Sequence, residues 1–140
     1  MSKIAIVYWS GTGNTEAMAN SVLAGAQAAG AQAELFTAAE FSPEKLAEYD
    51  AAAFGCPAMG EEQLEEDEFE PMFSACKAAL KGRKTALFGS YGWGDGEWMR
   101  SWEATAKGCG AALACESVIC ADAPDASARA ACEALGKALA

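Results

Sequence analysis

Short apolar segments alternate along the whole chain with longer segments of helical periodicity, and this alternation constrains the fold more than any other feature. Apolar runs typical of strands cover residues 3–8, 33–37, 50–56, 84–89 and 112–120. Apolar residues at helical spacing cover 14–29, 65–80, 96–107 and the segment after Asp125, and Ser42 caps a brief helix. The alternation predicts one parallel β-sheet covered on both faces by helices and joined by right-handed crossovers.

The length and hydropathy of the chain fit one soluble domain. Its 140 residues are 52% hydrophobic, which is enough for one core, and no repeat, linker or low-complexity tract divides them. We therefore expect a single domain over residues 1–140. No apolar stretch reaches the roughly 18 residues of a membrane span, and the N-terminus lacks the pattern of a secretory signal. These features predict a cytoplasmic protein that does not bind membranes.

The charge balance bears on the partners of the protein. The chain has twenty acidic and ten basic residues, for a net charge of -10. This excess argues against non-specific binding to nucleic acids or anionic membranes, which attract Lys and Arg. It favours a partner with a basic docking face, although acidity that only keeps the protein soluble accounts for the composition equally well.

Cysteine and histidine usage argues against metal chemistry. No two of the six cysteines have C-x-x-C spacing, which removes the usual zinc-ribbon, thioredoxin-like and ferredoxin-like interpretations. We interpret them as small core residues that stay reduced. The chain has no histidine, and so lacks the commonest general base and the commonest metal ligand.

Ligands of such sheets bind outside the carboxyl ends of the strands, where the first loop of this chain is rich in hydrogen-bond donors. Residues 9–15 read Trp-Ser-Gly-Thr-Gly-Asn-Thr, between a strand and a helix start. The glycines let the backbone amides turn inward, and three hydroxyls, one side-chain amide and the helix dipole favour an anion. No Gly-Lys-[Ser/Thr] follows, and the third glycine of a dinucleotide fingerprint is missing. The loop predicts a cradle for one terminal phosphate; an ordinary capped turn is the alternative.

Two further loops at the same edge carry side chains suited to a flat aromatic ligand. In the loop after the third strand, the thioether of Met59 can cover a ring, and Gly60 permits a positive φ. In the loop after the fourth strand, Trp93 stands between glycines that cannot pack against it. Met59 as core filler and Trp93 as a surface anchor are the simpler alternatives. Together with the first loop, these residues outline a cavity for a ring that carries a phosphate.

The three loops resemble the FMN loops of the flavodoxins, above all the short-chain flavodoxins of clostridia and related anaerobic bacteria. The matching strings are Ser-Gly-Thr-Gly-Asn-Thr at 10–15, Gly-Cys-Pro-Ala-Met-Gly at 55–60 and Gly-Ser-Tyr-Gly-Trp-Gly at 89–94. The resemblance spans essentially the whole chain. It implies a doubly wound, five-stranded parallel sheet of order 2-1-3-4-5. It also implies a monomer that binds FMN without a covalent bond, is not an enzyme, and carries single electrons at low potential between semiquinone and hydroquinone.

The resemblance also assigns roles to residues. The first loop would bind the FMN phosphate, Met59 and Trp93 would cover opposite faces of the isoalloxazine, and the Gly60 carbonyl would turn toward N5 on reduction. Glu62 would accept a hydrogen bond from N3, and backbone around Gly92 would meet the pyrimidine edge. The expected FMN site therefore comprises Ser10, Gly11, Thr12, Gly13, Asn14, Thr15, Pro57, Ala58, Met59, Gly60, Glu62, Ser90, Tyr91, Gly92, Trp93 and Gly94. The polar side chain that relatives place after the fifth strand has no match, unless Asp122 or backbone supplies the contact.

An acidic run borders the expected ring site. Residues 61–70 contain seven acids, which we expect to make the second reduction of FMN harder and to steer the protein to redox partners with basic docking faces. Two other functions remain open on the same residues. One is an FMN-dependent NAD(P)H–quinone reductase, which would need extra loops for a substrate. The other is a non-redox module that binds a different phosphorylated ligand.

Overall fold

The computed structural model describes residues 2–59, 63–92, 94 and 96–140. Within them, no helix is both long and apolar enough to cross a membrane. Strands and helices alternate as the sequence predicts, and short 3-10 helices cover Ala38–Glu40 and Lys77–Leu80. The remaining elements are β1 (Lys3–Tyr8), α1 (Asn14–Ala28), β2 (Gln32–Thr37), α2 (Pro43–Leu46), β3 (Ala51–Gly55), α3 (Phe69–Cys76), β4 (Lys84–Tyr91), α4 (Glu97–Gly108), β5 (Ala112–Leu113), β6 (Val118–Ala121) and α5 (Ala126–Leu139).

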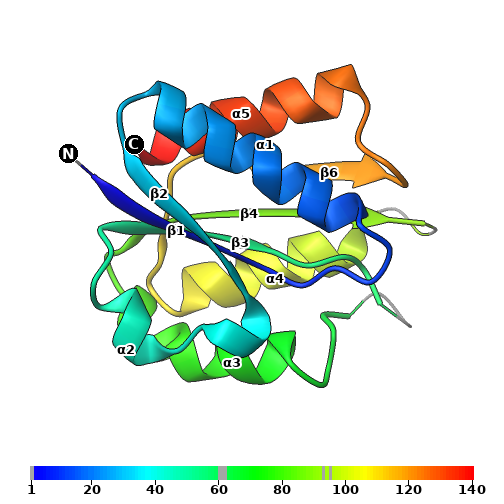
Figure 1. Ribbon diagram of the computed structural model, residues 1–140. Helices are drawn as coiled ribbons and strands as arrows, with labels where there is room; N and C mark the ends of the chain where they lie inside the picture. Colours follow the sequence, from blue (N-terminus) through cyan, green and yellow to red (C-terminus); the bar gives the residue numbers. More distant parts are fainter. Residues whose placement is uncertain (1, 60–62, 93, 95) are drawn as a thin grey trace.

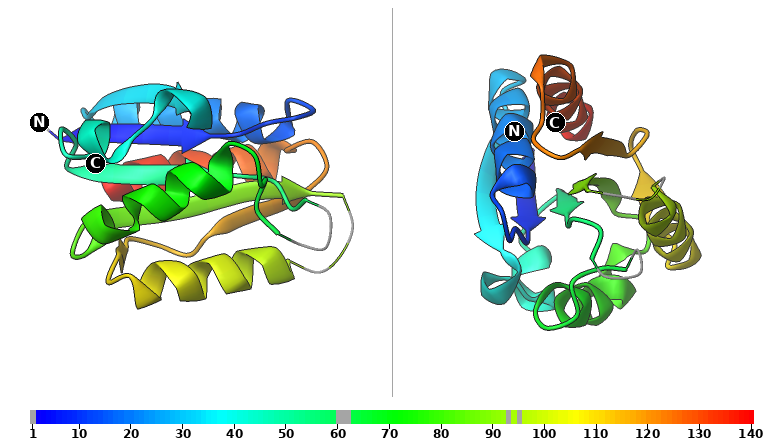
Figure 2. Two further views of the ribbon diagram at one scale, coloured as in Figure 1. Left: turned by 90° about the horizontal axis from the view of Figure 1, so that it is seen from below. Right: turned by 90° about the vertical axis from the view of Figure 1, so that its right-hand side faces the viewer.

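The strands form one parallel sheet whose order confirms the expected topology. The order is β2-β1-β3-β4-β5, and β6 also pairs with β4. Each pairing between these strands is parallel, with Ile4 beside Ala33 on one flank of β1 and beside Ala51 on the other. Because every strand runs the same way, the loops after the strands gather at one end of the sheet, as the two views in Figure 2 show.

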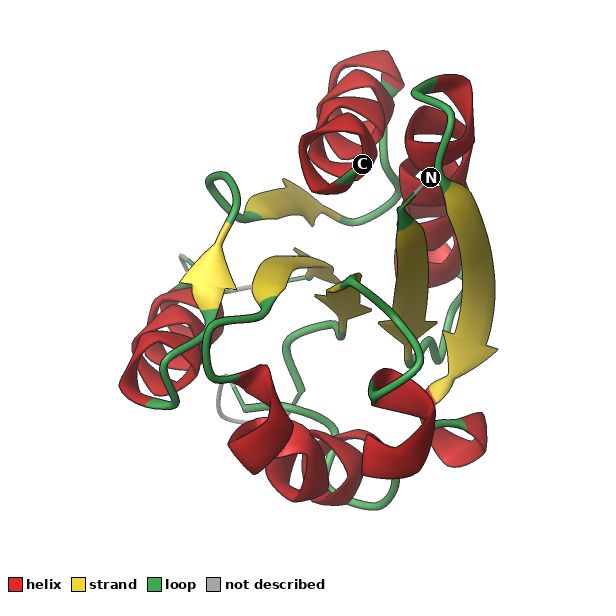
Figure 3. Ribbon diagram, turned by 90° about the vertical axis from the view of Figure 1, so that its left-hand side faces the viewer, coloured by secondary structure: helices red, strands yellow, loops and turns green. Residues whose placement is uncertain are grey.

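Helices cover both faces of the sheet and define two cores. Figures 1 and 3 show α1 and α5 on one face and α2, α3 and α4 on the other. The alternating side chains of β1 divide between them: Ile4 and Ile6 join the core under α1 and α5, whereas Ala5 and Val7 join the core that contains Phe73 and Trp102. The central strands are therefore buried on both sides, as expected of a parallel sheet between helical layers.

The alanine-rich third strand forms although alanine is a poor strand former. Residues 51–53 are all buried between β1 and β4, with pairs such as Ala52–Ala5 and Ala52–Thr85. At the end of this strand, a Cβ on Gly55 would lie 2.1 Å from the Phe88 ring. Small side chains in the middle of the sheet thus let neighbouring groups approach closely, and packing outweighs intrinsic propensity.

The fifth strand was expected to be continuous over 112–120, and the structure corrects this expectation. It divides into β5, which pairs with Lys84 and Thr85, and β6, which begins opposite Phe88. Four residues lie between Leu113 and Val118, whereas two lie between their partners on β4, Thr85 and Phe88, so the edge strand carries two extra residues. Such a bulge is favoured at a sheet edge, where only one neighbour constrains the strand.

The helix expected over 65–80 is also shorter than the periodicity indicates. Regular α-helix begins at Phe69, and the last turn, Lys77–Leu80, is 3-10. The buried carboxylate of Glu65 accepts hydrogen bonds from the amides of Asp67, Glu68 and Phe69, at 2.8–2.9 Å. These amides therefore bind a side chain in place of helical carbonyls, which delays the helix.

Candidate functional site

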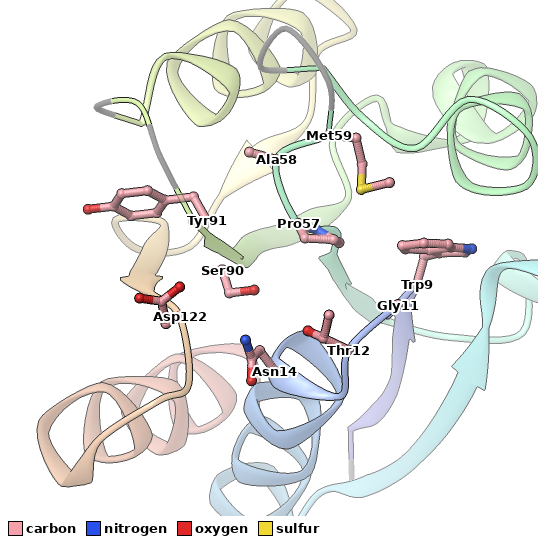
Figure 4. A pocket seen from close by; sticks show the side chains of 11 residues that line it. Trp9, Gly11, Thr12, Asn14, Pro57, Ala58, Met59, Ser90, Tyr91 and Asp122 are labelled. Atoms are coloured by element: carbon pink, nitrogen blue, oxygen red, sulfur yellow. The ribbon is translucent and has the colours of Figure 1, made fainter.

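A cavity of about 260 Å³ opens at the carboxyl end of the sheet, where the loops after β1, β3, β4 and β6 meet. Figure 4 shows Thr12 and Asn14 on one side, from the start of α1, and Trp9 and Met59 on another. Tyr91 and Asp122 face them across the cavity. The complete lining is Trp9, Gly11, Thr12, Asn14, Pro57, Ala58, Met59, Ser90, Tyr91, Gly92 and Asp122.

The first loop presents backbone amides at the start of α1. Gly13 adopts a left-handed φ of 96°, which glycine accommodates without strain. The hydroxyl oxygen of Ser10 accepts hydrogen bonds from the amides of Gly13 (3.0 Å) and Glu16 (3.3 Å). Among the described residues, this leaves the amides of Thr12, Asn14 and Thr15 without a protein acceptor. Such amides, together with the dipole of a 15-residue helix, favour an anion.

A buried hydroxyl pair joins the first loop to β4. Thr15 is 1% exposed and Ser90 5% exposed, and their hydroxyl oxygens lie 3.2 Å apart. Either hydroxyl can donate to the other, so the pair shares one hydrogen bond and leaves the second hydroxyl proton for an acceptor in the cavity, which Ser90 lines. The contact fixes the first turn of α1 against the strand that also carries Tyr91.

The loop after β3, called the third loop below, is held by hydrogen bonds on both flanks. The amide of Ala58 donates to the carbonyl of Ser90 at 3.0 Å, and the indole of Trp98 donates to the carbonyl of Cys56 at 3.2 Å. Met59 and Gln63 exchange two backbone hydrogen bonds of 2.8 and 2.9 Å. The thioether of Met59 is therefore carried into the cavity wall on a well-fixed backbone.

The expected site residues fall into three groups. The cavity is lined by Gly11, Thr12, Asn14, Pro57, Ala58, Met59, Ser90, Tyr91 and Gly92. Ser10, Gly13 and Thr15 lie next to this lining without being part of it, and Gly94, two positions after Gly92, is not among the lining residues. Gly60, Glu62 and Trp93 lie outside the described residues.

Two lining residues were not among the expected site residues. Trp9 directly follows β1, and its position before the glycine-rich loop was the available signal. Asp122 was considered only as a possible substitute contact. It adopts a left-handed φ of 57°, and its amide donates to the carbonyl of Tyr91 at 2.8 Å. This conformation directs an exposed carboxylate to the cavity, and non-glycine residues at positive φ often mark functional positions.

Comparison with known proteins identifies the family. Residues 6–135 match the family described as Flavodoxin. Over 110 residues, 79% of this chain and 80% of the relative, the chain is 44% identical to the flavodoxin of Megasphaera elsdenii. It is 42% identical over 120 residues to that of Clostridium beijerinckii, covering 86% and 87% of the two chains. The chain belongs to the flavodoxin family.

A solved flavodoxin structure agrees with this assignment along nearly the whole chain. The solution structure of two-electron reduced Megasphaera elsdenii flavodoxin superposes with a TM-score of 0.90 and 45% identity, covering 97% of both chains. Flavodoxins bind FMN and act with redox partner proteins as electron carriers rather than as enzymes. The earlier alternatives, a quinone reductase and a non-redox module, are therefore set aside.

The residues of the cavity fit the two ends of FMN. The open amides of the first loop, with the hydroxyl of Thr12, match the acceptor oxygens of a phosphate group. The rest of the wall is mostly apolar or aromatic, including Pro57, Met59 and Tyr91, as a flat ring system requires. The cofactor supplies the redox chemistry when bound, and the protein binds it and orients it.

Proposed function

We propose that this flavodoxin holds FMN in the cavity at the carboxyl end of the sheet and passes single electrons between larger redox proteins. The observation that carries the proposal is the convergence of three loops on one cavity, with unpartnered amides at one end and a thioether and aromatic wall at the other. The electron-carrier role is the property of the family, whereas the placement and the one-electron steps are our proposals.

In this proposal the first loop binds the phosphate through the amides of Thr12, Asn14 and Thr15 and the side chains of Thr12 and Asn14. Ser10 also shapes the loop, because its hydroxyl oxygen accepts hydrogen bonds from the amides of Gly13 and Glu16, and its proton is still available to the phosphate. The Thr15 hydroxyl shares one hydrogen bond with Ser90, which leaves one proton of the pair for a further acceptor. The side chains of Ser10 and Thr15 therefore remain proposed ligands of the phosphate.

Around the ring, Met59 and Tyr91 form two walls of the cavity, and Asp122 accepts hydrogen bonds from sugar-chain hydroxyls. The proposal also retains Trp93 over one ring face, Gly60 near N5 and Glu62 near N3, on the strength of the sequence resemblance. Asp122 would supply the polar contact that the loop after the last strand otherwise lacks. The carboxylate of Asp122 is anionic, so it can accept a hydrogen bond from a neutral hydroxyl group of the sugar chain, whereas it would repel the phosphate.

The acidic segment next to the site sets the energetics and the partners in this proposal. Glu66, Asp67, Glu68 and Glu70 are exposed on the segment that follows the third loop. Negative charge there raises the energy of any further negative charge placed in the cavity, which lowers the reduction potential. The same charges attract basic faces on partner proteins. We further propose that the protein works as a monomer in the cytoplasm.

A two-part assay tests the carrier function. The purified FMN-loaded protein is first mixed with NADH or NADPH and a quinone, and is then placed between a flavoprotein reductase and a one-electron acceptor such as cytochrome c. A carrier gives no turnover in the first mixture and accelerates electron flow in proportion to its concentration in the second. Steady turnover of NADH with a quinone by the protein alone would contradict the proposal.

A further inference from the structure

Trp9, the first residue of the first loop, contacts the acidic segment through Glu68, and the binding scheme above does not use it. Its side chain lines the cavity and also a neighbouring hollow that contains Tyr8, Ser10 and Glu68. In Figure 4 the ring stands at the side of the cavity opposite Tyr91, and its nitrogen points away from the cavity. The carbon part of the indole therefore lines the cavity, and its N–H group points away from the cavity.

The polar end of Trp9 is held by the acidic segment. The indole N–H donates to Oε1 of Glu68 at 3.1 Å, across 59 positions of sequence. Glu68 itself is fixed through its backbone, because its amide donates to the Glu65 carboxylate at 2.8 Å and the next residue, Phe69, is fully buried. The acceptor of the Trp9 hydrogen bond thus sits on a rigid part of the chain although its side chain is exposed.

The acidic segment is also joined to the third loop through backbone hydrogen bonds. Gln63, five residues before Glu68, exchanges two backbone hydrogen bonds with Met59. On its other side, Trp9 is joined to β3 by its amide, which donates to the carbonyl of Gly55 at 3.0 Å. Trp9 therefore connects the chain that begins the phosphate cradle with the chain that carries Met59.

We propose that Trp9 is a positioning residue for FMN, and that its hydrogen bond to Glu68 makes the first and third loops bind the cofactor as one unit. The inference rests on the proposed FMN site. With the hydrogen bond in place, the indole stands as a fixed wall beside Met59. Without it, the ring is held only by packing against its neighbours, and FMN binding has to restrict the added motion. An exposed hydrogen-bonded pair contributes little to folding stability, so its effect falls on the ligand.

The test compares FMN affinity among variants of the full-length protein, measured by the quenching of flavin fluorescence. Trp9→Phe keeps an aromatic ring without the donor, and Glu68→Ala removes the acceptor. Each is expected to weaken FMN binding by up to about tenfold, the upper end of what it costs to immobilise one freed side chain on binding. The double variant is expected to lose no more than either single variant, because both remove the same interaction.

Matched variants separate positioning from general effects of charge or folding. Glu68→Gln keeps an acceptor oxygen and is expected to stay within about threefold of the wild-type affinity. Glu66→Gln removes an exposed charge two positions away and is expected not to weaken FMN binding, because the loss of a negative charge beside the cavity favours an anionic ligand. Thermal unfolding of the FMN-free chains checks folding, and we expect shifts of at most about 2 °C.

Several outcomes would overturn the inference. Wild-type affinity in Trp9→Phe or Glu68→Ala, additive losses in the double variant, or a Glu68→Gln loss as large as that of Glu68→Ala would each do so. If Glu66→Gln weakened FMN binding as much as Glu68→Ala does, the effect would come from the charge of the segment and not from the hydrogen bond of Trp9. If the wild-type protein takes up no FMN, the proposed site fails together with this inference, whereas unchanged variants of an FMN-binding protein overturn the inference alone.

Discussion

The carboxylate of Glu65 lies buried before α3 and accepts three backbone N–H groups. Burial raises the pKa of Glu65, but the three hydrogen bonds lower it, and the net pKa lies below the ordinary value of 4.5. A carboxyl group whose pKa is depressed by folding stabilises the native state fully above its unfolded pKa. This stabilisation is lost as the pH falls through the lower, folded pKa.

Glu65→Gln is therefore expected to reduce the free energy of unfolding at pH 7 by about 1–2 kcal/mol. The difference from the wild type should shrink as the pH falls from about 4.5 toward the folded pKa, because the wild-type carboxylate becomes protonated. Urea unfolding at several pH values measures both quantities. Glu66→Gln, one residue along and exposed, is the control, and a difference that does not change with pH would contradict this account.

Three buried thiols give a second test at the level of residues. Desolvation raises the pKa of Cys56 and Cys132 to about 12 and that of Cys76 to about 11. At pH 8 these groups remain protonated, and the thiol form is a poor nucleophile. We expect iodoacetamide to modify the partly exposed Cys109 first and to reach these three only after urea is added, as followed by mass spectrometry. Rapid labelling of Cys132 in the folded protein would contradict their placement.

Single residues show where sequence reasoning succeeds and where it ends. Ser42 and Asp125 cap their helices as predicted, because a cap depends on neighbours three positions away. The part played by Trp9 was not predictable, since its partner Glu68 is distant in sequence. The same holds for Asp122, whose left-handed backbone follows no local rule.

Helices α1 and α5 pack closely against each other at two glycines. A Cβ on Gly136 would lie 2.1 Å from the carbonyl oxygen of Val22, and one on Gly25 would lie 2.0 Å from that of Glu133. Backbone atoms cannot move aside as a flexible side chain does. The two glycines therefore allow the helices to cross at a distance that no larger residue permits.

Gly136→Ala is expected to lower the free energy of unfolding by about 1–3 kcal/mol through overpacking. This loss should appear although alanine favours a helix by about 1 kcal/mol over glycine. Gly108→Ala is the matched control: it lies at the end of α4, where a Cβ meets nothing within 4 Å, and we expect no loss there. Urea unfolding of both variants measures these changes in stability. Equal losses in Gly136→Ala and Gly108→Ala would contradict the close crossing of α1 and α5.

The boundaries of the elements were the least predictable part of the fold. Residues 112–120 carry strand-like apolar residues throughout, so local pattern gave no sign of the interruption between β5 and β6. In the structure, Ser117 within that interruption donates to Glu103 of α4 at 2.7 Å, a tertiary contact. Likewise, the acids before Phe69 are compatible with helix by propensity, and only the folding of Glu65 onto the backbone excludes it.

For the molecule as a whole, the order of the sheet and the end that carries the site follow from alternation and parallel topology. The sequence also predicts that the run over 61–70, with seven acids in a chain of net charge -10, borders this site. The described acids that follow the third loop place part of this charge beside the cavity. An acidic face next to the redox site predicts docking governed by electrostatics.

Electron transfer from this protein to a basic acceptor such as cytochrome c should therefore slow by roughly tenfold as salt rises from about 0.01 to 0.15 M. The acidic face attracts the acceptor only while its field is unscreened. Stopped-flow measurements of the second-order rate constant test this expectation. Replacing Glu66 and Asp67 by their amides should weaken the salt dependence, and a rate that is independent of salt would count against docking through this face.

We propose that the cavity holds FMN and that the protein separates its reduction into one-electron steps. Stepwise anaerobic reduction of the loaded protein with dithionite, followed by absorbance and potential, tests both parts of this proposal. We expect two resolved one-electron steps, with the second at a markedly lower potential because of the neighbouring acidic residues. A single two-electron step, with no one-electron form at any stage, would contradict it.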